Sequence, residues 1–238
     1  MNKQVGVSLS EVLISLFLST LIITLLMQFY LSSKRQYVEV QKILTTNFDL
    51  HWVSELFSDS IRRAGFTPCF GIDELQVLDR RTQGGLIQGL KISTQPQQSV
   101  QVQRMSEHFA KVKALTSRSE LLLADSITFS KHRPLLIADC MHAEVQQIAN
   151  SEHSLIRLDK PLLFDYSLPI YVGEFIDERW FIKNNRLYYH LVQTEEVTSL
   201  VHSLAVENNH PKGKPLLKII MGLTKNKSYE FWVAVRGL

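Results

Sequence analysis

The sequence predicts an α+β protein in which one long N-terminal α-helix packs on a mostly antiparallel β-sheet head domain. Three observations lead to this prediction. Residues 12–31 carry no charge, no Pro or Gly occurs between Leu31 and Gly65, and the rest of the chain is a series of short apolar runs separated by turn residues. The first two features favour an uninterrupted helix, and the third is typical of a meandering sheet.

The composition is that of a folded protein without a marked charge. The chain has 238 residues, of which 45% are hydrophobic and 21% are charged, so the part after the apolar run is globular rather than disordered. The net charge is +3, from 26 basic and 23 acidic residues. The sequence shows no basic face with interleaved aromatic residues, so we expect no direct binding of nucleic acid.

The apolar run from Val12 to Leu31 is long enough to cross a membrane. At 1.5 Å per residue it covers about 30 Å, the thickness of the hydrocarbon core of a bilayer. An ordinary signal peptide has a shorter apolar region and then a cleavage site with small residues, whereas this run continues into a polar helix. A plain membrane anchor fits the length but leaves Glu11 unexplained, because a carboxylate at the edge of such a run is costly to bury.

The residues around Glu11 form a motif. The order Gly6-Val7-Ser8-Leu9-Ser10-Glu11, with Lys3 before it and the apolar run after it, resembles the class III signal of type IV pilins and type II secretion pseudopilins. In that family a prepilin peptidase cuts a short basic leader after the glycine, and the new N-terminal residue is N-methylated. The resemblance therefore implies a leader at residues 1–6, cleavage between Gly6 and Val7, and methylation at Val7. The usual residue after the glycine is Phe, and Val7 keeps an apolar N-terminus.

The same resemblance implies that Glu11 acts in assembly. Cleavage frees the amine of Val7, and the carboxylate of a neighbouring subunit can neutralise it, which makes both charges easier to hold in lipid. In the family this pair sets the axial register of a subunit that enters the fibre. The alternative is that Glu11 lies solvated at the level of the lipid headgroups.

We expect the helix to continue well beyond the apolar run, to a total length of roughly 85 Å. Residues 7–31 would form its transmembrane and assembly half, and residues 32–64 its amphipathic half. Arg62 and Arg63 suit the C-terminal end of a helix dipole, and Gly65 and Pro68 would terminate the helix. Apolar residues at helical spacing predict a core-facing stripe, widened by Val53, Phe57 and Ile61. The stripe consists of Tyr37, Val40, Leu44, Phe48, Trp52 and Leu56.

Two cysteines far apart in the chain extend the resemblance. Ile61-Arg-Arg-Ala-Gly-Phe-Thr-Pro-Cys69 and Ile137-Ala-Asp-Cys140-Met-His-Ala-Glu-Val resemble elements of minor pilins of the PilW type. The resemblance implies a disulfide between Cys69 and Cys140, and the alternative is two buried free thiols. Neither cysteine belongs to a CxxC pair, which disfavours a zinc site and thioredoxin-like chemistry.

The head, residues 65–238, is expected to be rich in strands. Met105, Phe109, Val112 and Leu115 match the spacing of one short amphipathic helix. Asn184-Asn185 and Lys225-Asn226-Lys227 are expected to form hairpin turns. Trp232 and Val233 are expected in a late strand, at or near a sheet edge. The expected strands are 121–129, 144–148, 155–158, 170–182, 186–192, 201–207, 216–223 and 229–235.

The sequence contains no motif for catalysis or for a bound group. It has no HExxH and no GxSxG, and nothing pairs Asp139 with Glu144 as an acid and a base. Cys140-Met-His142 has the spacing of metal ligands, but a disulfide at Cys140 explains it better. We therefore predict no catalytic residue, no metal and no cofactor, and no enzymatic activity.

The resemblance implies a structural role, that of a minor pilin which helps to prime a type IV pilus and sits at its tip. The implied partners are the prepilin peptidase, other minor pilins, the major pilin and the inner-membrane assembly platform. The implied location is the inner membrane, with a single pass, a cytoplasmic N-terminus and a periplasmic head, and then the pilus. Two alternatives stay open: a minor pseudopilin of type II secretion, and a periplasmic enzyme or binding module on an uncleaved anchor.

Overall fold

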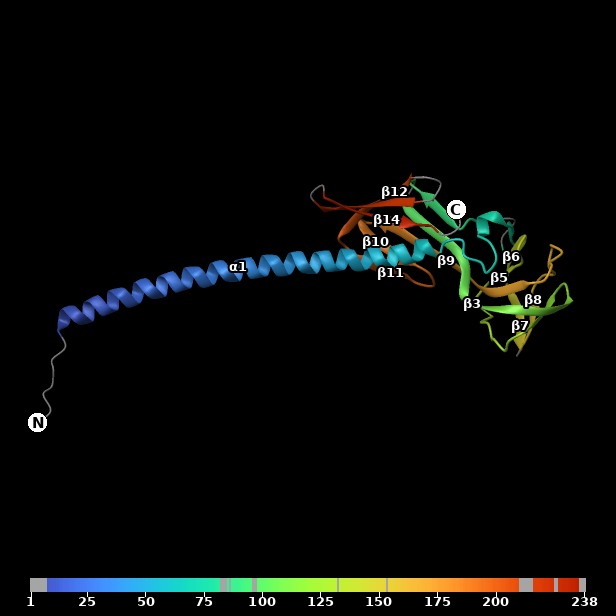
Figure 1. Cartoon of the computed structure of the whole chain (residues 1–238), viewed down its shortest axis with the longest axis horizontal. Helices are drawn as coiled ribbons and strands as arrows, with labels where there is room; N and C mark the ends of the chain where they lie inside the picture. Colours follow the sequence, from blue (N-terminus) through green and yellow to red (C-terminus); the bar gives the residue numbers. More distant parts are fainter. Residues whose placement is uncertain are drawn as a thin grey trace, which may run out of the picture. The chain divides into compact units, whose positions relative to one another are not determined.

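The structure is a computed structural model that describes residues 8–81, 85, 87–95, 98–131, 133–152, 154–209, 216–224 and 227–235. One helix, α1 (Leu9–Arg62), is continuous over 54 residues, and the elements after it are almost all strands (Figure 1). The chain divides into two compact units, with the boundary between His51 and Trp52. The predicted long helix and mostly antiparallel β-rich domain are both present.

In the first unit, the side chains of α1 are exposed along nearly its whole length. The apolar residues between Leu9 and Leu31 are 42–81% exposed, and the later Tyr37, Leu44 and Phe48 are 63–72% exposed. Within this chain the stripe that the sequence predicts to be core is therefore uncovered from Tyr37 to Phe48.

The last turns of α1 belong to the second unit, and they correct the predicted packing face. Val53, Phe57 and Ile61 are 0–1% exposed, whereas Trp52 and Leu56 are 52% and 40% exposed. Successive residues of a helix are rotated by about 100°, so the row at positions 53, 57 and 61 faces away from most of the stripe. The side chains that pack in the core are Val53, Phe57 and Ile61, which the sequence analysis placed beside the predicted stripe. The prediction that the stripe itself faces the core is wrong for Trp52 and Leu56.

Gly65 ends the helix as predicted. Its φ of 69° lies in the left-handed region, which glycine adopts without a steric penalty. Its N–H donates to the carbonyl of Gln103 at 3.0 Å, and its own carbonyl accepts the N–H of Ile72 at 2.8 Å. Ile72 begins a short 3-10 helix, η1 (Ile72–Glu74), and is fully buried. The turn after α1 is thus tied to the sheet immediately.

Most strands belong to one 11-stranded sheet with the order β1-β6-β5-β9-β3-β4-β8-β7, in which β2 pairs with β3, and β10 pairs with both β9 and β11. All these pairs are antiparallel except β1 with β6. The bounds are β1 (Gln76–Asp79), β2 (Leu90–Ser93), β3 (Ser99–Ser117), β4 (Glu120–Leu123), β5 (Leu135–Ala138), β6 (His142–Gln146), β7 (Ile148–Glu152), β8 (Leu155–Leu158), β9 (Ile170–Lys183), β10 (Arg186–His190) and β11 (Thr194–Thr198).

Strand β3 contradicts one prediction. The expected helix at Met105–Leu115 is part of this 19-residue strand, which pairs with β9 over most of its length. The register shifts between Met105 and Phe109, so the buried side chains do not keep a simple alternation through the strand. Met105 and Phe109 pack against one buried cluster and Val112 packs in the other, so apolar residues on both faces of the strand produce spacings of three and four residues, which resemble those of a helix.

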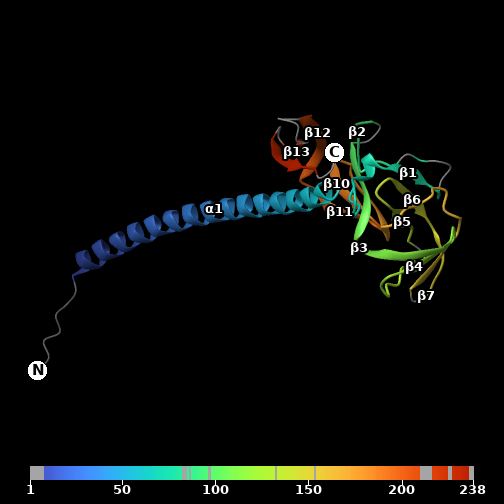
Figure 2. The ribbon, with the colours of Figure 1, turned by 45° about the vertical axis from the view of Figure 1, so that its right-hand side comes forward.

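The remaining strands form a separate three-stranded antiparallel sheet, β12 (Val201–Asn209), β13 (Leu216–Leu223) and β14 (Ser228–Ala234), with β13 in the middle. Figure 2 shows β12 and β13 at the opposite end of the head from β4 and β7. The sequence predicted these three strands but not their separation into a second sheet. Strand β14 lies at an edge of this sheet, as expected, with Val233 buried and Trp232 48% exposed.

The other predicted strands agree with the structure to different degrees. β8 and β13 have the expected bounds, while residues 121–129 are strand only to Leu123, and residues 144–148 are split between β6 and β7. Asn184 and Asn185 have φ values of 51° and 56° and join β9 to β10 in the expected turn. Lys225 and Asn226 of the second predicted turn lie outside the described residues.

The core of the head lies on both faces of β5. Leu135 and Ile137 pack in one buried cluster, with Ile156 of β8. Leu136 and Ala138 point the other way into a second cluster, with Ile72. A strand buried on both faces is a continuous apolar run and does not alternate, which is why its sequence gave no strand signal.

Candidate functional site

The N-terminal end of α1 is organised by Glu11. The backbone N–H of Ser8 donates to Glu11 Oε2 at 3.1 Å, and the N–H of Glu11 donates to the carbonyl of Ser8 at 3.0 Å. This is the carboxylate half of a capping box, in which the third residue of a helix reaches back to the N-cap amide. Glu11 therefore has a local role that the sequence analysis missed, although the Ser-x-x-Glu spacing signals it. Gly6 and Val7 lie outside the described residues.

The serine and threonine hydroxyls within the apolar run are satisfied inside the helix. Four hydroxyls each donate to a carbonyl one turn earlier: Ser15 to Val12 at 2.9 Å, Ser19 to Ser15 at 2.7 Å, Thr20 to Phe17 at 2.8 Å, and Thr24 to Thr20 at 2.7 Å. No water is needed to satisfy these donors, which is the condition that hydrocarbon surroundings impose.

Length and composition make α1 a candidate membrane-spanning helix, the one such helix in the described part of the chain. Within this chain its apolar window is exposed. A single-pass anchor near the N-terminus is compatible with these observations.

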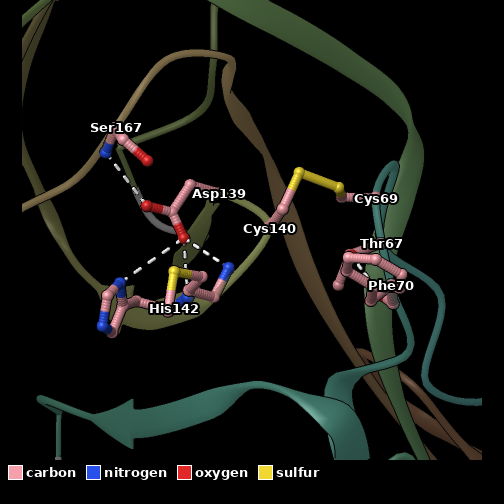
Figure 3. Close-up of a disulfide and its surroundings, with 8 residues drawn as sticks. Thr67, Cys69, Phe70, Asp139, Cys140, His142 and Ser167 are labelled. Atoms are coloured by element: carbon pink, nitrogen blue, oxygen red, sulfur yellow. Dashed lines mark hydrogen bonds and ion pairs between the residues drawn. A yellow bond between two sulfur atoms is a disulfide. The ribbon is translucent and has the colours of Figure 1, made fainter.

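The disulfide joins Cys69, in the connection between α1 and η1, to Cys140, between β5 and β6 (Figure 3). The Cα atoms are 5.3 Å apart, within the usual range for a disulfide. The bond spans 71 positions of sequence and fixes the segment that leaves the helix to the turn between β5 and β6. The alternative of two free thiols does not apply.

Asp139, beside Cys140, acts as a clamp for the backbone. Its carboxylate is nearly fully buried and accepts the N–H groups of Met141 at 2.8 Å, His142 at 2.6 Å and Ser167 at 3.0 Å (Figure 3). Burial acts to raise the pKa of Asp139, but these three N–H groups and the nearby His142 outweigh it, and the pKa is lowered below its ordinary value. The ionised carboxylate thus holds the turn at Cys140 to the connection between β8 and β9.

Glu144, on β6, holds the same connection at a second point. Its side chain is fully buried and accepts the N–H groups of Leu163 at 2.7 Å and Phe164 at 2.9 Å, while Gln146 Nε2 donates to its other oxygen at 2.8 Å. Asp139 and Glu144 are therefore both engaged by amide donors, and both hold backbone segments in place.

His142 stacks on Phe164, with ring centroids 4.8 Å apart, and its Nδ1 lies 3.6 Å from Asp139 Oδ1. The two groups form an ion pair when His142 is protonated. Among the described residues no three His, Cys, Asp or Glu side chains converge as they would around a metal ion.

No protein-family model, no curated protein and no solved structure matches this chain. The features that bear on function are the sequence motif at Gly6–Glu11 and the geometry described above.

Proposed function

We propose that this protein is a non-enzymatic subunit of a type IV pilus-like fibre, a minor pilin with a pilin-like fold that helps to prime assembly and sits at the tip. One observation carries the proposal. An exposed apolar helical surface free of charge from Val12 to Leu31 begins immediately after a carboxylate, Glu11, and the processing motif at Gly6-Val7 precedes both.

In this proposal the apolar half of α1 serves two environments in turn. Before assembly it spans the inner membrane, and its internally bonded hydroxyls permit this. After assembly its exposed apolar side chains pack against the helices of other minor pilins and of the major pilin. The head faces the periplasm, where a disulfide such as Cys69–Cys140 persists.

Processing would change the surroundings of Glu11. Prepilin peptidase cuts between Gly6 and Val7 and leaves a methylated, positively charged amine one residue before Ser8. Two opposite charges at the end of an apolar helix attract each other strongly once water is excluded. The pair formed by a Val7 amine and the Glu11 of an adjacent subunit would then select the register at which a subunit enters the fibre.

A substitution series separates this role from the local cap. Glu11→Gln keeps an oxygen that can accept the Ser8 N–H but removes the charge, whereas Glu11→Leu removes both. If charge pairing governs assembly, both variants fail to assemble, and Glu39→Gln, at an exposed position of the same helix, assembles normally. Fibres are counted by electron microscopy in cells that lack the native copy. Normal assembly of Glu11→Gln would refute the charge-pair mechanism and leave the cap as the role of Glu11.

The mass of the intact mature chain tests the processing step. The proposal predicts loss of residues 1–6 and the gain of one methyl group. A chain that still begins at Met1 would support the alternative of an uncleaved anchor that carries a periplasmic enzyme or binding module. A minor pseudopilin of type II secretion would be processed identically, so secretion and pilus formation must be measured separately in a strain that lacks this protein.

A further inference from the structure

The head contains a groove that neither the assembly helix nor the disulfide accounts for. It lies beside the last turns of α1 and the strands β9, β10 and β11, and its volume is about 410 Å³. This volume is within the range of pockets that hold a ligand or a side chain of a partner. The residues that define its character are Trp52, Leu56, Trp180, Tyr189, Leu191 and Glu195.

Sheet register places three of these side chains in one row. Trp180 on β9 is opposite Tyr189 on β10, and Tyr189 is opposite Glu195 on β11. Residues opposite each other on adjacent strands project from the same face of a sheet. The rings of Trp180 and Tyr189 accordingly lie 4.7 Å apart, with an angle of 51° between their planes. The row therefore places the half-buried ring of Tyr189 between the buried ring of Trp180 and the exposed carboxylate of Glu195.

The aromatic wall is held in place from behind. Trp180 Nε1 donates to Ser60 Oγ at 3.2 Å, and its ring meets Phe57 edge-on with centroids 5.0 Å apart. Below it, the buried Arg104 and Glu178 form an ion pair with an Nη2 to Oε1 distance of 2.8 Å, and Ser60 also bonds to Glu178. Because Arg104 and Glu178 neutralise each other, the floor of the groove is polar but carries little net charge.

The phenol of Tyr189 is a further polar group in the wall. Burial and the neighbouring Glu178 raise the pKa of Tyr189 to about 12, so the hydroxyl stays protonated at physiological pH.

Among the described residues, one carboxylate of the groove has no ion-pair partner. The lining contains four carboxylates, Asp59, Glu178, Glu195 and Glu196, and two guanidinium groups, Arg63 and Arg104. Asp59 pairs with Arg63, and Glu196 pairs with Arg186 outside the lining at 2.9 Å. In the part of the chain that the structure describes, Glu195 makes no ion pair.

We propose that this groove binds a basic segment of a partner protein, in which an Arg or Lys side chain lies next to an apolar residue. The cation would lie over the half-exposed ring of Trp52 and against Glu195, while the apolar neighbour covers Leu56 and Leu191. An acidic segment is disfavoured by Glu195, and a wholly apolar segment would bury that carboxylate without a partner.

Fluorine NMR on the full-length protein in detergent micelles, labelled with fluorotryptophan, tests the proposal. The three tryptophans, Trp52, Trp180 and Trp232, give three resonances, which single Trp→Phe variants assign. The probe is a blocked pentapeptide, acetyl-Gly-Leu-Arg-Leu-Gly-amide, and its control carries citrulline, the uncharged isostere, in place of arginine. We expect the arginine peptide to shift the resonances of Trp52 and Trp180 but not that of Trp232.

The charge dependence decides the outcome. We expect the citrulline peptide to bind about fivefold more weakly or worse, and Glu195→Gln to weaken the arginine peptide to that level without affecting the citrulline peptide. Glu152→Gln, on β7, is the matched control and should change nothing. The proposal is overturned if the two peptides bind equally, if only Trp232 responds, or if no resonance moves at about 10 mM peptide. It is also overturned if methyl glucoside shifts Trp52 and Trp180 and the arginine peptide does not, because the groove would then be a sugar site.

Discussion

The buried pair of Arg104 and Glu178 should be essential to the stability of the head, but only as a pair. Arg104 is 5% exposed and Glu178 is 4% exposed, and the carboxylate accepts bonds from Arg104 Nε at 3.2 Å, from Arg104 Nη2 at 2.8 Å and from Ser60. Glu178→Leu leaves the guanidinium buried without its counter-ion. Removal of one partner of a buried ion pair lowers the free energy of unfolding by about 3–5 kcal/mol.

The double variant Arg104→Met/Glu178→Leu should recover much of this loss. Two apolar side chains of similar volume carry no desolvation penalty, and such replacements of whole pairs are often close to neutral. We therefore expect the double variant to be more stable than Glu178→Leu by at least about 2 kcal/mol, which corresponds to strong coupling between the two sites.

Denaturant titration of the full-length protein in micelles, with the disulfide intact and tryptophan fluorescence as the signal, measures both quantities. The matched control is Asp165→Leu, because the pair of Arg118 and Asp165 is exposed and should contribute less than about 1 kcal/mol. The single variant Arg104→Met completes the cycle. The pair is not essential if Glu178→Leu lies within about 1 kcal/mol of the native protein, or if the effects of Arg104→Met and Glu178→Leu simply add in the double variant.

Three further predictions concern the connections of the head. Reduction of the disulfide, or the double variant Cys69→Ser/Cys140→Ser, should lower the free energy of unfolding by roughly 4 kcal/mol, because the bond closes a loop with a sequence separation of 71. An unchanged midpoint of denaturant unfolding would contradict this prediction. The lowered pKa of Asp139 means that the unfolded chain binds its proton more readily, so the contribution of this carboxylate is fully present above its ordinary pKa of 3.8 and is lost as the pH falls through the lower native value. Asp139→Asn should flatten the acid limb of a plot of stability against pH, and an unchanged acid limb would show that other groups govern it. Gly89→Ala should lower the free energy of unfolding by about 1–3 kcal/mol, because the new Cβ would lie 2.6 Å from the Cα of Gly65, a backbone atom that cannot rotate away. Thermal unfolding measures this loss, and an unchanged midpoint would mean that the two loops separate freely.

Local signals predicted the elements that local physics determines. The uninterrupted helix followed from the absence of Pro and Gly before Gly65, and the turn at Asn184-Asn185 followed from the tolerance of Asn for positive φ. The strand β8 is bounded by Ser154 and Asp159, and Pro215 precedes the strand β13, and these residues do not favour strands. In each case the determining interaction lies within a few residues along the chain.

Long-range contacts explain what the sequence could not show. The face of α1 that packs was misjudged because Trp52 and Phe57 are equally apolar, and only the sheet beneath them, with Trp180, decides which is buried. The helix predicted at Met105–Leu115 followed from apolar residues on both faces of a strand, and the pairing of β3 with β9 outweighs any local helical preference.

Some candidate sites were visible in the local sequence, and others depend on long-range contacts. The Ser8–Glu11 cap and the disulfide have short sequence signatures. The groove has none, because its side chains come from α1, from β3, β9, β10 and β11 and from the turn after β10, and they meet only after the sheet has formed. The backbone partners of Asp139, which include the distant Ser167, were equally invisible in the sequence.

The pairing of β1 with β6 has a consequence for the order in which the head opens. It is the one parallel pair among the described strands, β1 is a four-residue strand at the end of the sheet order, and the disulfide joins the segments that lead into the two strands. With the bridge reduced, β1 has the least to retain it. Its amide protons should then exchange with deuterated solvent well before those of β5 and β9, so that fraying would begin at this margin while the centre of the molecule is still closed.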